Sequence, residues 1–109
     1  MKTTYKVRIS RSAKLDLDEI ISFYSQERID YAKNVMLMIK KSIQSLKTFP
    51  EKGRIVPELS DHNIHEYREI LSSYWRILYK IENSDVFVHA IIDGRRNTEE
   101  LLMRKLSRR

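Results

Sequence analysis

The stretch that decides the fold spans residues 67–97, with the sequence YREILSSYWRILYKIENSDVFVHAIIDGRRN. From Trp75 to Ile81 its residues alternate with the period of a strand whose two faces differ. Residues 82–85 predict a turn, and residues 86–92 predict a further strand rich in β-branched side chains. Strands that are so close in sequence are expected to pair antiparallel. Residues 67–92 therefore predict three neighbouring strands of one sheet.

Upstream of this stretch, the pattern predicts one strand and two helices. Residues 3–9 alternate as a half-buried strand does, and Ser10 or Ser12 can cap the helix that follows. Residues 26–30 break the helical pattern, and Asp30 can cap the second helix. Two amphipathic helices joined by a short turn form an antiparallel pair. Their apolar stripes are Ala13, Leu17, Ile20, Ile21 and Tyr24 in the first, and Ala32, Val35, Met36, Ile39, Ile43 and Leu46 in the second.

The remaining segments complete a single domain that spans residues 1–109. Residues 49–57 predict a loop because they contain two prolines and a glycine, and residues 58–66 are polar and ambiguous. Asn97 can cap a last helix, with Glu100 returning the bond. The element order is then β-α-α-β-β-β-α, an α+β fold with an antiparallel sheet and the helical hairpin packed on one face. The other face, which carries Arg76, is expected to be partly open.

Composition narrows the functional classes. The chain has 21 Lys and Arg against 15 Asp and Glu, a net charge of +6 that favours acidic or polyanionic partners. It has no cysteine, which excludes disulfides and thiolate chemistry. No apolar run is long enough for a membrane span, and the N-terminus lacks the apolar stretch of a signal peptide. We therefore expect a cytoplasmic protein.

Motifs for metals and cofactors are weak or missing. His62, His65 and Glu66 are close in sequence but lack the spacing of a zinc-protease helix. Two glycines in the whole chain are too few for a phosphate-binding loop or a dinucleotide fingerprint. We therefore expect no metal and no cofactor.

Ribonuclease chemistry is the enzymatic alternative. Cleaving RNA through its own 2′-hydroxyl needs a base, an acid and cations for the developing charge. Each candidate for proton transfer also fits an ordinary role in sheet packing. The candidate cations are Arg68, Arg76, Arg95 and Arg96, and the candidate proton-transfer groups are His89, Glu69, Tyr74 and Tyr79.

The basic pair Arg95–Arg96 lacks an obvious structural role. Positive charge just before a helix N-terminus opposes the helix dipole, and adjacent arginines repel one another. A local cost with no visible local gain favours contact with a partner. After Arg96 the sequence offers no Tyr or His before its end, so the pair has cations without an evident acid or base beside it.

With these elements in place, the chain resembles the RelE/ParE superfamily of bacterial toxins from type II toxin–antitoxin systems. The resemblance spans nearly the whole sequence. Its segments are YKVRISRSAKLDLDEI, FPEKGRIVPEL, YREIL, YWRILYKI and IIDGRRN followed by leucines. The pattern is more similar to the ParE branch, whose members are associated with inhibition of DNA gyrase, than to RelE-like ribosome-dependent mRNA nucleases. Those nucleases typically carry a Tyr or His near the start of the last helix, where this chain has Asn97, Thr98 and Glu99.

The resemblance implies a toxin that binds DNA gyrase and is neutralised by an acidic antitoxin. The expected target contacts are Arg76, Arg95, Arg96 and Tyr74. The expected antitoxin contacts are Leu101, Leu102 and Leu106 on the last helix, or else the helix pair. Two alternatives remain open: an mRNA endonuclease that uses Arg76, Arg95, Arg96 and His89 on the ribosome, and a basic interaction domain without toxicity.

Overall fold

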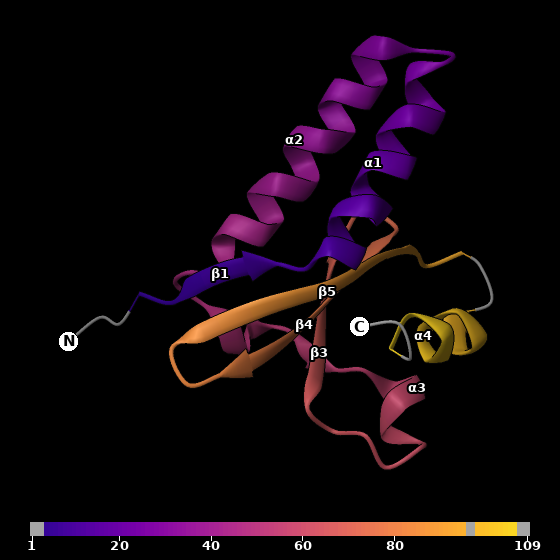
Figure 1. Ribbon diagram of the computed structural model, residues 1–109. Coiled ribbons are helices and arrows are strands. Elements are labelled where there is room, and N and C mark those ends of the chain that lie inside the picture. The colour runs from indigo at the N-terminus through magenta and orange to yellow at the C-terminus, as the bar shows by residue number, and fades with distance from the viewer. Residues whose placement is uncertain (1–3, 96–97, 107–109) are drawn as a thin grey trace.

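The computed structural model describes residues 4–95 and 98–106 as a five-stranded sheet with helices on both faces (Figure 1). The α+β class and the order of the main elements are confirmed. Three short elements, η1, β2 and α3, lie in the region predicted to be a loop or left ambiguous. The chain order is β1 (Lys6–Ile9), α1 (Arg11–Ser25), α2 (Ile29–Ser45), η1 (Pro50–Lys52), β2 (Arg54–Ile55), α3 (Pro57–Ser60), β3 (Tyr67–Ser72), β4 (Trp75–Glu82), β5 (Asp85–Asp93) and α4 (Thr98–Leu106).

The sheet has the strand order β1-β5-β4-β3-β2. Strands β3, β4 and β5 pair antiparallel through short turns, as their sequence predicts. The expectation of an antiparallel sheet is wrong at one edge, because β1 pairs parallel with β5. A parallel pair needs a long connection, and the helices and strands between β1 and β5 supply it. The first strand is also shorter than expected, and residue 3 lies outside the described residues.

The helical hairpin α1–α2 covers one face of the sheet and projects beyond it (Figure 1). Ser10 caps α1, since its Oγ accepts a hydrogen bond from the Ala13 backbone N–H at 3.0 Å. The prediction that Asp30 caps α2 is wrong: the cap position is Arg28, and Asp30 lies in the first turn, where its charge suits the helix dipole. None of the described helices is long and apolar enough to cross a membrane.

The opposite sheet face is covered, which corrects the expectation that it is partly open. Helices α3 and α4 lie against it (Figure 1), and they close a second apolar core. This core, called the α4-side core below, consists of Val56, Leu59, Tyr67, Leu78, Ala90, Ile92 and Leu102. The core beneath the hairpin is called the hairpin-side core, and it includes Leu17, Ile39, Trp75, Ile77 and Val88.

A β-bulge in β5 explains why its two faces are hard to assign from sequence. Leu78 pairs with Ala90 and Tyr79 pairs with Val88, so His89 is the extra residue. Val88 and Ile91 consequently belong to the hairpin-side core, and Ala90 belongs to the α4-side core. The bulge shifts the alternation by one residue near the C-terminal end of the strand.

Candidate functional site

The predicted contact residue Arg95 lies in the turn that follows β5. Its Nε and Nη2 donate to the Asp93 carboxylate at 2.9 and 2.8 Å, and its backbone N–H donates to the same side chain at 2.9 Å. The guanidinium also lies over the ring of Tyr74, 3.6 Å from its centroid. The Arg95 side chain is still 56% exposed. Arg95 is therefore held in one orientation while most of its surface faces solvent.

Tyr74 is held from the other side by two tyrosines of the hairpin. Its hydroxyl hydrogen-bonds with the hydroxyls of Tyr24 at 3.2 Å and Tyr31 at 3.3 Å. Its ring contacts Trp75, with centroids 4.8 Å apart. The hydrogen bond with Tyr24 is the largest cause that raises the pKa of Tyr74, and the bond with Tyr31 adds to it. Tyr74 is therefore a neutral phenol at physiological pH that supports the Arg95 guanidinium.

Gly94 lets the Arg95 turn approach the β3–β4 turn closely. Its backbone N–H donates to the Tyr74 carbonyl at 2.9 Å. A Cβ at this position would lie 2.9 Å from that carbonyl oxygen and 3.2 Å from Cγ of Arg76. A side chain does not fit without displacing the backbone of Tyr74, so glycine is required by the close approach. The turn at Gly94 is thus also the point where Tyr74, Arg76 and Arg95 come together.

Arg76, predicted to be a target contact on an open face, is buried. Its Nε donates to Glu69 Oε1 at 2.5 Å, and its Nη1 and Nη2 each donate to a Glu58 oxygen at 2.7 Å. The hydrogen bonds to Glu58 are the largest cause that raises the pKa of Arg76. Its side chain is 8% exposed, because α3 brings Glu58 over it. Arg76 therefore connects α3 to the sheet through Glu58, and its aliphatic stem packs against the turn at Gly94.

Glu69 joins this arrangement into a chain of four charged residues. Its side chain is 1% exposed, and its second oxygen accepts from Arg54 Nε at 2.7 Å. The resulting order is Glu58–Arg76–Glu69–Arg54, with two charges of each sign. A buried carboxylate paired in this way serves structure, so Glu69 is not available for proton transfer.

The other candidates for proton transfer also have structural partners. Tyr79 is buried, donates to the Pro50 carbonyl at 2.5 Å and accepts from the Gly53 N–H at 3.0 Å. Burial is the largest cause that raises its pKa. His89 packs edge-on against Tyr67, with ring centroids 5.4 Å apart, and Tyr67 belongs to the α4-side core. Arg68, a candidate cation, donates to the Gly53 carbonyl at 2.8 Å. The structure does not bring these residues to the Arg95 turn.

A cleft of about 570 Å³ lies beside Arg95, between α1 and α4. Its lining includes Trp75, Ile91 and Leu101, with Arg104 and Glu19 among its charged residues. The two helices are connected across it by an ion pair between Asp16 and Lys105, and the Ile91 N–H donates to the same carboxylate at 3.0 Å. Burial is the largest cause that raises the pKa of Asp16, partly offset by Lys105.

The leucines predicted to contact an antitoxin are only partly accessible. Leu102 is fully buried in the α4-side core, while Leu101 and Leu106 are half-buried against it. The apolar side of α4 therefore packs onto its own sheet, as an amphipathic helix does when a core is available. Of the three, Leu101 also lines the cleft beside Arg95. Arg96, the other residue of the basic pair, and Asn97, the predicted cap, lie outside the described residues.

The histidines near α3 take part in local contacts. His62 pairs with Glu99 at 2.8 Å, and His65 contacts Ser60 and Asn63 at 3.1 Å. Within residues 4–95 and 98–106, no three His, Asp or Glu side chains gather in a way that could hold a metal ion.

Several site residues were missed from the sequence. The helical pattern gives Tyr24 only a place in the first apolar stripe and does not single out Tyr31, yet both hold Tyr74, across 50 and 43 residues of chain. Glu58 and Asp16 were not singled out at all. Asp16 carries a usable signal, since it falls on the buried side of the α1 stripe beside Ala13 and Leu17. A charge on an apolar stripe predicts a buried partner.

Two solved structures with a similar fold indicate the class of protein to which this fold belongs. The chain is similar to a structure of the chromosomal ParDE toxin–antitoxin system from P. aeruginosa, with a TM-score of 0.67 and 15% identity over 83% of this chain and 96% of that one. It is also similar to a structure of the RelBE2 toxin–antitoxin complex from Mycobacterium tuberculosis, with a TM-score of 0.59 and 16% identity over 84% and 92%. The fold is thus that of ParE and RelE toxins.

The sequence assigns the family within this class. The family model for the ParE toxin of the type II toxin-antitoxin system parDE matches residues 7–98. The chain therefore belongs to the ParE toxin family, as the resemblance in its sequence indicates. No curated protein is similar enough in sequence to match it.

Proposed function

We propose that this ParE-family toxin arrests growth by binding DNA gyrase, that Arg95 and Tyr74 contact the target, and that no RNA cleavage is involved. The proposal depends mainly on one observation, that the Arg95 side chain is both held in place and exposed. Its guanidinium is fixed by Asp93 and by the Tyr74 ring, and it is exposed. A cation held in its binding orientation loses little freedom when a partner binds, so more of the contact energy remains as affinity.

The surroundings of Arg95 support binding over chemistry. General acid–base catalysis needs a group whose pKa lies near the working pH. Tyr74 has its pKa raised further from neutrality, and Asp93 is engaged by three hydrogen bonds from Arg95. His89 packs against Tyr67 in the other core region. Tyr74 and Asp93, the two side chains that hold the Arg95 guanidinium, are therefore both engaged in positioning it, which supports contact with a partner over proton transfer.

A supercoiling assay with purified gyrase tests the proposal. We expect the wild-type toxin to block supercoiling or trap cleaved DNA, and Arg95→Ala to lose at least about tenfold in potency, as central arginines of interfaces do. Arg8→Ala is the matched control, because Arg8 is similarly exposed and paired with an aspartate, Asp85, at 3.3 Å. We expect it to inhibit like the wild type.

Two results would contradict the proposal. Supercoiling that is unaffected at large toxin excess would exclude gyrase as the target. Primer extension on ribosome-bound mRNA tests for RNA cleavage. Codon-linked cuts that disappear in Arg95→Ala would contradict the proposal that the toxin acts by binding alone. Growth arrest on induced expression would distinguish either kind of toxin, the gyrase inhibitor or the mRNA nuclease, from a domain without toxicity.

A further inference from the structure

The exposed side of α2 carries charge of one sign. Between Asp30 and Glu51 the chain has four lysines and no acidic residue. All four lysines are exposed, three of them on α2 and one in the turn that follows it. A helix has about 3.6 residues per turn, so lysines seven or eight residues apart lie on the same side of it. We call these residues the α2 lysine stripe: Lys33, Lys40, Lys41 and Lys47.

The lysines of the stripe have no internal partner for their charge. In the part of the chain that the structure describes, Lys80 and Lys105 form ion pairs, and no lysine of the stripe does. The positions three and four residues before and after Lys40 and Lys41, where a helix places side-chain partners, hold no acid. An exposed helix whose charges serve only solubility mixes both signs along its face. The single sign on α2 therefore favours an anionic partner.

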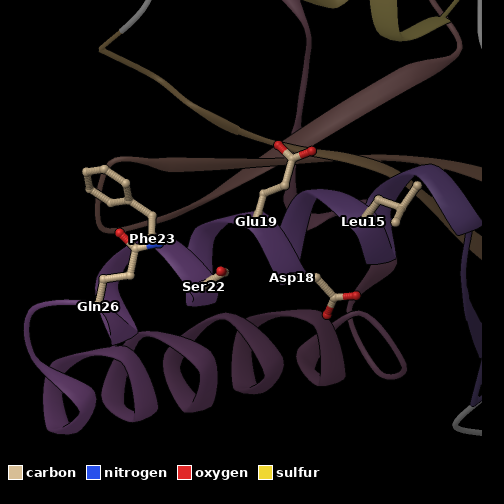
Figure 2. Close-up of a pocket in the computed structure, with 6 residues that line it drawn as sticks. All are labelled: Leu15, Asp18, Glu19, Ser22, Phe23 and Gln26. Atoms are coloured by element: carbon tan, nitrogen blue, oxygen red, sulfur yellow. The ribbon is translucent and has the colours of Figure 1, made fainter.

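Helix α1 presents a different surface. Figure 2 shows Asp18 and Glu19 between Leu15 and Phe23 along its exposed side, so acidic and apolar residues alternate there. In Figure 1, α2 lies on the side of the hairpin away from α4. The cleft beside Arg95 lies between α1 and α4. The unmixed positive charge of the hairpin is therefore on α2, apart from the proposed target contact.

The stripe suits the phosphates of a nucleic acid better than a protein or a membrane. Lysine is depleted at the centres of protein interfaces, whereas it is a main phosphate contact in nucleic-acid complexes. A helix that lies on a membrane needs a broad apolar face. The apolar face of α2 is packed into the hairpin-side core through Val35, Ile39 and Ile43, and Leu37 is the apolar side chain exposed among the lysines.

The length of the stripe also fits a duplex. At a rise of about 1.5 Å per residue, the stripe is about 21 Å long, which corresponds to about six base pairs at 3.4 Å each. The lysines are point charges on flexible stems, so they can reach phosphates without a fixed geometry. Such contacts read the backbone of a nucleic acid and not its sequence.

We propose that the α2 lysine stripe is a sequence-independent binding site for duplex DNA, in which each of its four lysines meets a backbone phosphate. The choice of DNA over RNA rests on the proposed function, because gyrase acts on duplex DNA. The stripe then raises the concentration of the toxin along the DNA where its target works, while Arg95 contacts the enzyme.

Fluorescence anisotropy with a short labelled DNA duplex and the full-length toxin tests the site. We expect log K to fall with log salt at a slope of about −3 to −4, which is about −0.9 for each of four phosphates. Lys33→Ala/Lys40→Ala should reduce the steepness of this slope by about 2 and weaken the Kd at low salt at least about tenfold. Lys33→Arg/Lys40→Arg keeps the charge, so it should bind within about twofold of wild type.

A matched control removes the same charge from another face. Arg11→Ala/Arg104→Ala changes two exposed arginines that line the hollows on the α4 side of α1. It should bind DNA within about threefold of wild type and with nearly the same salt slope, because neither residue contacts a phosphate in the proposed site. Circular dichroism verifies that each variant is folded.

Three results would overturn the proposal. The first is a wild-type toxin that does not bind the DNA duplex at low salt. The second is an equal loss in Lys33→Ala/Lys40→Ala and in the control, which would mean that net charge alone attracts DNA. The third is tighter binding to an RNA duplex, or to vesicles that contain phosphatidylserine, than to DNA. These titrations contain no gyrase, so intact DNA binding by a toxin that leaves supercoiling unaffected would contradict the proposed target and not the stripe.

Discussion

Two arginines at the same end of the sheet, Arg76 and Arg95, have opposite surroundings. Arg76 is buried between Glu58 and Glu69, whereas Arg95 is exposed and held by Asp93 and the Tyr74 ring. Arg76 lies against Gly94, and Arg95 follows Gly94 in the chain. The buried Arg76 therefore supports the turn from which Arg95 projects. The comparison shows that residue type alone does not decide which arginine is exposed, because Glu58 and Glu69 enclose Arg76 whereas Asp93 leaves Arg95 open to solvent.

The largest expected effect comes from removing the buried arginine. Arg76→Ala leaves Glu69 buried with only Arg54 as a partner, and it should lower the free energy of unfolding by about 3 kcal/mol. Urea unfolding followed by circular dichroism measures the loss. Arg95→Ala should leave the urea midpoint unchanged, since its side chain is exposed. A stable Arg76→Ala variant that no longer inhibits gyrase would reverse the comparison and make Arg76 the contact residue.

The next effect concerns the turn between the two arginines. Gly94→Ala places a Cβ against the Tyr74 carbonyl and the Arg76 stem, so it should cost about 1–3 kcal/mol of unfolding free energy and most of the gyrase inhibition. Ser84→Ala, in the turn between β4 and β5, is the control and should change neither quantity. If Gly94→Ala inhibits fully, Arg95 does not depend on the shape of this turn.

A smaller effect separates the ring of Tyr74 from its hydroxyl. Tyr74→Phe removes the hydrogen bonds with Tyr24 and Tyr31 but keeps the ring beneath Arg95, so it should cost about 1 kcal/mol or less. Gyrase inhibition should persist in this variant and fall in Tyr74→Ala, which loses the ring. Equal inhibition by both variants would show that the ring does not position Arg95.

The smallest effect is a pH dependence from Asp16. Because burial raises its pKa in the folded state above 3.8, the folded protein binds this proton more readily than the unfolded chain does. The contribution of Asp16 to stability should therefore rise as pH falls from neutrality toward 3.8, and level off below it. Urea titrations of wild type and Asp16→Asn at several pH values measure it. If the stability of wild type relative to Asp16→Asn instead falls on acidification, the Lys105 ion pair outweighs the effect of burial on the pKa of Asp16.

The sequence predicts the fold well where the hydrophobic period is unambiguous. The alternation in β4 and the stripes of α1 and α2 correspond to the residues of the hairpin-side core. It fails for β5, where the bulge at His89 shifts the alternation, and for the covered sheet face. Helix α3 has four residues, too few to show a helical period, so its role over Arg76 could not be predicted.

Of the contact residues that the sequence predicts, the structure leaves Arg95 exposed over the Tyr74 ring and buries Arg76, which was expected on an open face. The position of Arg76 on an alternating strand says which face it is on, and not whether a helix covers that face. Glu58 lies 18 residues from Arg76 and Tyr24 lies 50 residues from Tyr74. Such pairs leave no local pattern, because nothing in the spacing of neighbouring residues depends on them.

The sequence by itself determined the α+β class, the family, and the presence of cations after the last strand. Those properties depend on the hydrophobic periodicity of short segments and on amino-acid composition, and both can be read directly from the sequence. Only the tertiary structure decided which arginine is exposed, that Gly94 brings two turns together, and that a cleft adjoins Arg95. Those properties depend on distant elements packing against one another, and burial and ion pairing exist only once that packing has formed.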